Sequence, residues 1–260
     1  MKKILSFIIC LSLFTACIKD KQVNGVSVVT PENLLDYVTS KITKDPDATI
    51  SLHADALGKD FTTPKVSVMA FINGNLNDGS AIKEVSVGSL KLPRVVDSLN
   101  NRIFFSSNSD TNNPFGKSIP VVFNTSFFDL QTNFRLPELV KLKITIDNDL
   151  LSKSNGYTLY WNADANNNLP VQISFQYDEF ASKFFSPNLT FPKEDIQITK
   201  FVTDEGQFNF SPSDLAKFPS GGAIRVSISR GSFSYQKSNS KNILLYALST
   251  DTYPTLRVID

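Results

Sequence analysis

The sequence holds only two cysteines, one histidine and one tryptophan among its 260 residues. Both cysteines, Cys10 and Cys17, lie close to the N-terminus, so the rest of the chain has none with which to form a disulfide. His53 is alone, which excludes a multi-histidine metal site and leaves at most one base for a nucleophilic triad. We therefore expect no metal and no cofactor.

Recognisable catalytic and phosphate-binding motifs are also missing. The sequence has no Gly-x-Ser-x-Gly elbow, no phosphate-binding loop and no dinucleotide fingerprint. An excess of one charge is lacking as well, because 26 basic residues stand against 25 acidic ones. A nucleic-acid-binding surface needs a concentrated basic patch, and none is visible. The sequence predicts a protein that is not an enzyme and does not bind nucleic acid.

An apolar run near the N-terminus is too short to span a membrane. Lys2 and Lys3 precede about 11 mainly apolar residues at positions 4–14, whereas a transmembrane helix needs about 20. Small Thr15 and Ala16 follow and lead to Cys17. Basic residues, an apolar core and small residues before a cut are typical of a cleaved export signal. We expect residues 1–16 to be such a signal.

The stretch Phe14-Thr15-Ala16-Cys17 resembles the lipobox of bacterial lipoproteins. The resemblance implies cleavage between Ala16 and Cys17, a diacylglycerol on the Cys17 sulfur and a further acyl chain, such as palmitate, on the new N-terminus. Two or more acyl chains hold a protein firmly on a membrane. The alternative is an ordinary secretory signal with an incidental cysteine at the cut.

Residues 17–29 are predicted to be a lipidated tether, because the segment after Cys17 is polar. Lys19, Asp20 and Lys21 resemble the signals that direct Bacteroidota lipoproteins to the outer membrane. That resemblance implies a lipid-anchored protein of the outer membrane, on either its periplasmic or its cell-surface face.

A short helix is predicted to follow the tether, over residues 30–42. Thr30 is suited to cap it and Pro31 to occupy its first position. Leu34, Leu35, Val38 and Ile42 recur at helical spacing on one face, so we expect the helix to pack on the first of two sandwich domains, over residues 30–149.

Alternation with a period of two dominates after residue 48 and predicts an all-β fold. Strands are indicated by residues 65–72, 141–146, 157–161, 171–178 and 224–229, in which apolar and polar side chains alternate. Turn residues separate these runs, as expected for antiparallel sheets. A turn-rich stretch over residues 147–156 places a domain boundary near residue 150.

The second half, residues 150–260, resembles an immunoglobulin-like or fibronectin type III sandwich. Leu159-Tyr160-Trp161 ends an aromatic strand, a polar loop follows, and the next strand carries Tyr177. The phrases at residues 202–208, 211–215 and 228–231 also resemble sandwich modules of Bacteroidota envelope lipoproteins. The resemblance implies two antiparallel β-sandwich domains of immunoglobulin-like type.

Trp161 is the main candidate for ligand contact, with Tyr160 and Tyr177 as neighbours. A flat indole can stack on a sugar ring, and the tyrosines could extend this platform. The competing interpretation places Trp161 in the core, because it shares a strand face with Leu159 and Tyr157.

Three further patterns supply candidate sites. The loop over residues 162–168 has oxygen-bearing side chains at alternate positions but lacks the glycine and closing glutamate of a calcium loop. Ser98, in Asp97-Ser98-Leu99, resembles an O-glycosylation acceptor of Bacteroidota exported proteins, although a turn start fits equally well. A glycosidase needs two carboxylates in one cleft, and it is the least favoured hypothesis. Its candidates are Asp178, Glu179, Glu194, Asp195, Asp204 and Glu205.

These features together predict a non-enzymatic lipoprotein of the cell envelope that serves as a binding or structural module. Besides the membrane, its partner is expected to be an envelope protein or a glycan. A glycan-binding accessory of polysaccharide uptake would show an exposed aromatic platform. An adhesive or structural subunit would instead show a free edge strand that can accept another strand.

Overall fold

Strands dominate the described part of the chain, and the all-β prediction is confirmed. The structure is a computed structural model that describes residues 31, 33–42, 44–57, 65–72, 82–97, 102–109 and 114–260. Residues 31–260 group into one unit. Cys17, Ala16 and Ser98 lie outside the described residues, so the structure says nothing about lipidation, cleavage or glycosylation.

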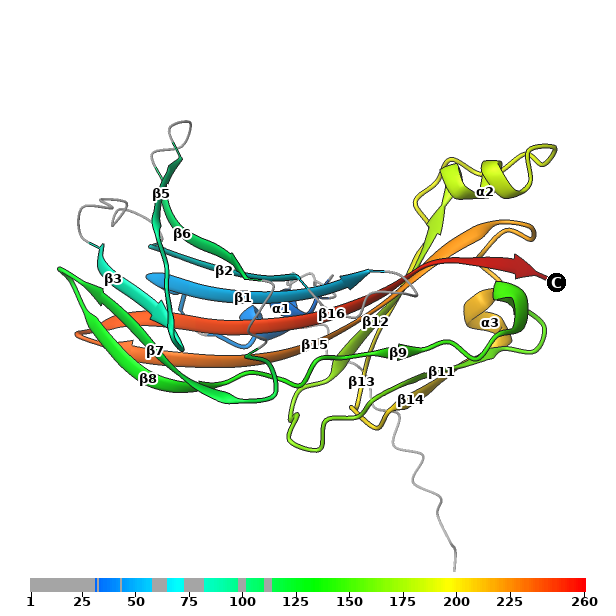
Figure 1. The fold of residues 1–260 in the computed structure, drawn as a ribbon. Coiled ribbons are helices and arrows are strands. Elements are labelled where there is room, and N and C mark those ends of the chain that lie inside the picture. The colour runs from blue at the N-terminus through cyan, green and yellow to red at the C-terminus, as the bar shows by residue number, and fades with distance from the viewer. Residues whose placement is uncertain are drawn as a thin grey trace, which may run out of the picture. The chain divides into compact units, whose positions relative to one another are not determined.

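Nine strands of the described chain form one large sheet (Figure 1). Its order is β13-β12-β15-β16-β1-β2-β6-β5, and β10 also pairs with β16. The bounds are β1 (Ala48–Leu57), β2 (Lys65–Ile72), β5 (Arg94–Asp97), β6 (Arg102–Ser109), β10 (Leu150–Ser152), β12 (Val171–Asp178), β13 (Gln197–Val202), β15 (Ala223–Ser238) and β16 (Lys241–Ile259).

Two smaller sheets pack against this large sheet. One has the order β4-β3-β7-β8 and the other β14-β11-β9. Their bounds are β3 (Ile82–Val87), β4 (Leu90–Lys91), β7 (Ser118–Thr125), β8 (Asp129–Arg135), β9 (Leu142–Lys143), β11 (Tyr157–Trp161) and β14 (Gln207–Phe210). A turn, η3 (Asp147–Asp149), lies between β9 and β10.

Most neighbouring strands are antiparallel, as predicted, but β16 has two parallel partners. Ala48 of β1 pairs with Ile243, and Leu150 of β10 pairs with Arg257. The large sheet is therefore mixed. Parallel pairing joins segments that are far apart in sequence, so local alternation cannot reveal it.

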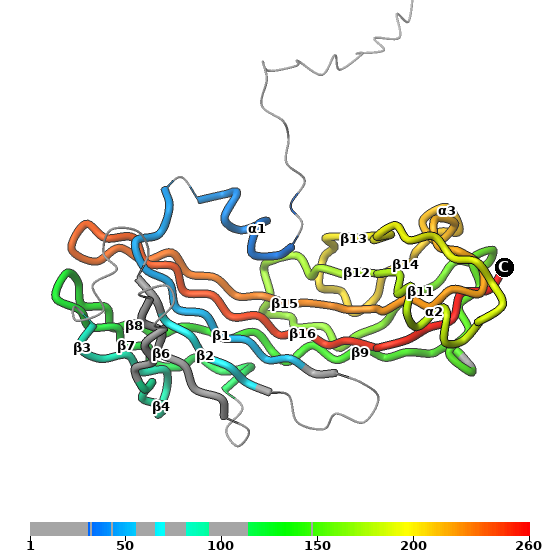
Figure 2. Tube along the Cα trace, turned by 90° about the horizontal axis from the view of Figure 1, so that it is seen from above, coloured from blue at the N-terminus to red at the C-terminus, as the bar shows by residue number. Residues whose placement is uncertain are grey.

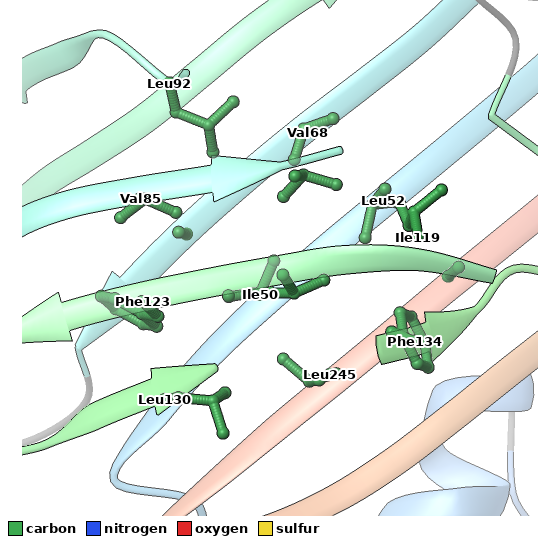
Figure 3. Packing of buried hydrophobic residues seen from close by; sticks show 14 of the residues in the cluster. Ile50, Leu52, Val68, Val85, Leu92, Ile119, Phe123, Leu130, Phe134 and Leu245 are labelled. Atoms are coloured by element: carbon green, nitrogen blue, oxygen red, sulfur yellow. The ribbon is translucent and has the colours of Figure 1, made fainter. Parts of the chain in front are cut away.

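The first core lies between the large sheet and the β4-β3-β7-β8 sheet. Figure 3 shows Ile50, Leu52, Val68 and Leu245 of the large sheet facing Phe123 and its neighbours from the smaller one. The chain leaves this core at Leu136 and reaches the second core at Val140.

The second core lies between the other end of the large sheet and the β14-β11-β9 sheet. Phe175 of β12 stacks on Phe210 of β14 with 4.2 Å between ring centroids. Both cores draw on β16, because Ile243 and Leu245 belong to the first and Leu256 and Val258 to the second. Figure 2 shows β15 and β16 running side by side from one core to the other.

The predicted helix is shorter than expected and packs elsewhere. It forms α1 (Leu34–Thr39), capped by Asn33 rather than Thr30. Its Leu34 N–H donates to Gln172 Oε1 of β12 at 2.8 Å, and Tyr37 stacks on Phe201 of β13 at 5.4 Å. The helix therefore braces strands that were assigned to the second domain, not the first.

Two further short helices lie in the second half of the chain. They are α2 (Glu179–Phe185), which extends directly from β12, and α3 (Pro212–Leu215). A capping box between Ser211 and Asp214 caps the N-terminus of α3. Within the described ranges, no helix has the length and apolar character that crossing a membrane requires.

Candidate binding groove at the junction of the two cores

A polar hollow lies where the chain passes from one core to the other. It has a volume of about 270 Å³ and is lined by Arg135, Pro137, Asp164, residues 166–169 and residues 231–233. We call it the junction groove. It lies beside β15 at the point where the neighbouring strand β12 begins.

The edge of β15 beside the junction groove lacks a strand partner among the residues that the structure describes. β12 pairs with β15 only as far as Ser229, whereas β16 pairs with it up to Ser238. We call residues 231–238 the free edge. At an unpaired edge, alternate residues direct their N–H and C=O groups away from the sheet, where another strand can bind them.

Side chains of the free edge, rather than its main chain, form the hydrogen bonds to the described neighbouring segments other than β16. Ser232 Oγ donates to the Arg135 carbonyl of β8 at 2.6 Å, and Ser238 Oγ donates to the Asp129 carbonyl at 2.6 Å. On the other side, Tyr235 Oη donates to the Lys44 carbonyl at 2.8 Å. The segment after α1 and strand β8 therefore flank the free edge, and the bonds that join them to it come from side chains.

A fully buried arginine forms the base of this junction. Arg230 donates from Nε to Asp204 Oδ2 at 2.6 Å and from Nη2 to Asp204 Oδ1 at 2.9 Å. It also donates to the carbonyls of Glu138, at 3.2 Å, and Asn162. One guanidinium thus ties β15 to the segment between the cores and to two loops.

Asp204 has further donors besides Arg230. Trp161 Nε1 and Asn167 Nδ2 each donate to its carboxylate at 2.8 Å. Burial raises the pKa of Asp204, whereas the hydrogen bonds from Arg230, Trp161 and Asn167 lower it. The lowering is the larger effect, so the pKa lies below the ordinary value. Asp204 therefore stays ionised at neutral pH and cannot serve as a general acid.

Asp164 shapes the wall of the junction groove. Its carboxylate is almost fully buried and accepts from the backbone N–H groups of Asn166, at 2.9 Å, and Glu138, at 3.1 Å. Arg135 approaches it at 3.7 Å, yet 42% of the arginine side chain is exposed. The groove therefore offers an accessible guanidinium beside amide side chains and main-chain groups, which suit a polar polymer such as a polypeptide.

The predicted aromatic platform is wrong. Trp161 and Tyr177 are both buried, each 6% exposed, whereas Tyr160 is 37% exposed. Alternation along β11 directs Trp161 into the second core and Tyr160 to the opposite face. The core interpretation of Trp161 is confirmed, because Asp204 accepts its indole N–H inside the protein.

Tyr160 lies in a separate, wide hollow of about 300 Å³, beside Thr158 and Asn209. No other tyrosine or tryptophan that was considered for the platform lines it. Tyr157 also lines this hollow but is 8% exposed, so Tyr160 is the widely exposed ring there and gives a sugar less stacking area than the predicted platform would have given.

Several of the glycosidase candidates are engaged in structural contacts, whereas Glu194 and Asp195 are exposed. Asp178 caps α2 and lies 3.3 Å from Arg225, while Glu179 pairs with Lys183 at 2.6 Å. The junction groove has one carboxylate in its lining, Asp164, and the hollow beside Tyr160 has none. The described residues also contain no group of three or more metal-ligating side chains.

The structure also shows an apolar surface on α2 that was not predicted. Four side chains are widely exposed: Phe180 (84%), Phe184 (76%), Phe185 (42%) and Leu189 (51%). We call them the α2 surface. The sequence contains a signal for it: three phenylalanines lie within six residues directly after a strand. This segment lacks period-two alternation, so a search for strands does not select it.

Comparison with known proteins assigns no family to the chain. No protein-family model matches it, and no curated protein is significantly similar to it.

Proposed function

We propose that this protein is a non-enzymatic, lipid-anchored envelope protein that binds an extended polypeptide by adding it as a strand to the free edge of β15. The carrying observation is that, within the described ranges, residues 231–238 have a strand on one side only. Strand addition of this kind gives affinity through main-chain hydrogen bonds. This is the adhesive or structural alternative among the functions considered.

The junction groove supports a polypeptide ligand. It adjoins the free edge at residues 231–233, and its amide side chains and Arg135 can hydrogen-bond to peptide carbonyls. The glycan-binding alternative has lost its main support with the burial of Trp161. Polysaccharide binding that does not depend on the free edge is the outcome that would revive it.

The anchor belongs to the proposal on sequence grounds. Cleavage between Ala16 and Cys17 and lipidation of Cys17 would hold the protein on the outer membrane, at its periplasmic or cell-surface face. Cys17→Ser should abolish partitioning into detergent, and unchanged partitioning would contradict the anchor.

We also propose that the two cores are two immunoglobulin-like sandwiches, predicted over residues 30–149 and 150–260, that share β16: its Ile243 and Leu245 lie in the first core, and its Leu256 and Val258 lie in the second. Support comes from each core lying between one end of the large sheet and its own smaller sheet. Comparing the strand connections of an experimental structure with those of immunoglobulin-like domains tests this.

The free edge can be tested with proline. Asn239 and Ser240 both have positive φ between the paired residues Ser238 and Lys241, a two-residue hairpin turn. Ser238 and Lys241 flank the turn and exchange main-chain hydrogen bonds. Counting back from Ser238, every second residue of β15 bonds to β16 through its main chain, so the N–H of Tyr235, which lies between two such residues, points to the free edge. Tyr235→Pro removes that donor, while Tyr235→Ser keeps it and loses the same side chain.

The assay places a photocrosslinking side chain at exposed Lys237 in the full chain in its native cells. We expect one specific adduct in the parent protein and in Tyr235→Ser, and its loss in Tyr235→Pro. In the purified complex, the amides of the free edge should gain protection from hydrogen exchange. An adduct that persists in Tyr235→Pro, or amides that stay unprotected, would refute strand addition.

A further inference from the structure

The apolar surface on α2 arises because the helix turns its small side chains inward. Ser182 is fully buried. Its Oγ donates to the Asp178 carbonyl at 2.6 Å and accepts from the Ala223 N–H at 2.7 Å. Ser186 Oγ also donates to the Gly221 carbonyl at 3.2 Å. Because serines hold the helix to β15 and its neighbouring turn, the phenylalanines lie on the outer side.

This arrangement reverses the usual amphipathic helix, whose apolar face packs on the core. Phe180 and Phe184 lie one turn apart, and Phe184 meets Phe185 edge-on with 5.5 Å between ring centroids. Leu189 lies on the segment that follows. Large apolar side chains gathered on one exposed surface mark a site of contact with another apolar surface.

The composition of the α2 surface favours lipid over protein. Its four residues are phenylalanine and leucine, whereas the energetic centres of protein interfaces are enriched in tryptophan, tyrosine and arginine. The charged pair beside it, Glu179 and Lys183, is internally neutralised at 2.6 Å, and Arg257 lies over Phe185 at 6.0 Å from the ring centroid, so the cation borders Phe185 rather than Phe180. The surface is therefore suited to a bilayer interface through apolar burial, not through attraction to anionic lipid.

The tether has the reach to place α2 on the membrane. The 13 residues from Ile18 to Thr30 span at most about 45 Å. Helix α1, which follows them, packs its Leu34 against Gly231, and Ala223 beside α2 lies eight residues away along β15. Eight residues of strand span about 26 Å, which is less than the tether can cover.

We propose that Phe180 and Phe184 insert into the interface of the bilayer that carries the lipid anchor, so that α2 is a second membrane contact. This rests on the proposed anchoring of the chain at Cys17. The acyl chains hold the protein at the membrane, and the α2 surface fixes which side of its body faces the lipid.

The test uses an unlipidated chain from Ile18 to Asp260, which retains the whole compact unit of residues 31–260. It is floated with phosphatidylcholine vesicles. We expect the parent chain to bind and Phe180→Ser/Phe184→Ser to reduce the partition coefficient at least about tenfold. Binding should change by less than about twofold between about 0.05 M and about 0.5 M NaCl, or when anionic lipid is added.

Phe127→Ser is the matched control, because Phe127 is also exposed, at 39%, but lies in the β7–β8 hairpin. It should bind vesicles like the parent chain. The unlipidated chain has no cysteine, so Asn188→Cys can carry an environment-sensitive dye beside Leu189. Its emission should shift to the blue on vesicles, whereas a dye at Lys237→Cys should not respond.

Several results would overturn the proposal. These are absence of vesicle binding by the parent chain, equal binding by the double variant, or a dimer in solution that the double variant abolishes without any vesicle binding. The last would mean that a second copy covers the α2 surface. Detergent partitioning of the full chain tests Cys17 separately, so failure of the anchor and failure of the α2 contact are distinguishable.

Discussion

Arg230 and Asp204 form a two-point ion pair inside the protein, with Nε–Oδ2 and Nη2–Oδ1 distances of 2.6 and 2.9 Å. Their side chains are 0% and 2% exposed. Desolvating both charges is costly, and the pair is stable because hydrogen bonds from Trp161 and Asn167 and to backbone carbonyls satisfy the remaining groups. The pair fixes the segments that build the junction groove.

Removing one partner of this pair should strongly destabilise the fold. Arg230→Met leaves the Asp204 carboxylate buried without its cation, and we expect the free energy of unfolding to fall by about 3–5 kcal/mol. Arg230→Met/Asp204→Leu should cost less than the sum of the two single changes. Urea unfolding of the four proteins measures this, and additive losses would contradict the coupling.

Stability should fall as the pH drops below about 4. The Lys200 ammonium and the Ser211 side chain lower the pKa of Asp214 from 3.8 to about 2. A carboxyl group whose pKa is lower in the folded state contributes stability above its unfolded pKa and loses it as the pH falls through the folded value. Asp214→Asn should therefore cost about 1–2 kcal/mol at pH 7 and almost nothing near pH 2. Urea midpoints at several pH values test this, and a cost independent of pH would contradict it.

The emission of the single tryptophan should report a buried indole. Trp161 is 6% exposed and donates to Asp204 at 2.8 Å. We expect emission at short wavelength, weak quenching by acrylamide and no response to polysaccharides. A red-shifted, readily quenched signal that responds to one polysaccharide would contradict this burial and restore the platform hypothesis.

Two phenylalanines five positions apart should respond oppositely to truncation. Phe175 is fully buried against Phe210, so Phe175→Ala should cost about 3–5 kcal/mol. Phe180 is 84% exposed, so Phe180→Ala should change stability by less than about 0.5 kcal/mol. Thermal or urea unfolding compares them, and a large loss in Phe180→Ala would show that α2 packs inward.

Alternating side chains made much of the strand structure predictable. Val171, Ile173, Phe175 and Tyr177 are buried as expected, and Ile224, Val226 and Ile228 behave in the same way. Such patterns are informative because one face of each strand meets a core. Residues 144–146 continue the alternation but lie outside β9, since their side chains pack on the second core without strand pairing.

Long-range pairing and outward-facing apolar residues were not predictable from local patterns. β1 and β16 pair in parallel although Ala48 and Ile243 are far apart in the chain. The free edge depends on where β12 begins relative to β15, which no single segment encodes. The α2 surface escaped because a phenylalanine carries the same apolar signal whether it faces a core or solvent.

Because β16 contributes side chains to both cores, neither core is complete before residues 241–259 are available. The N-terminal strands are synthesised first, but β1 can pair with its parallel neighbour only after β16 has been synthesised. Such non-local pairing slows folding. For a chain that we propose is exported, this delay keeps it unfolded and threadable until translation ends, and a stop anywhere before residue 223 would leave neither half able to fold.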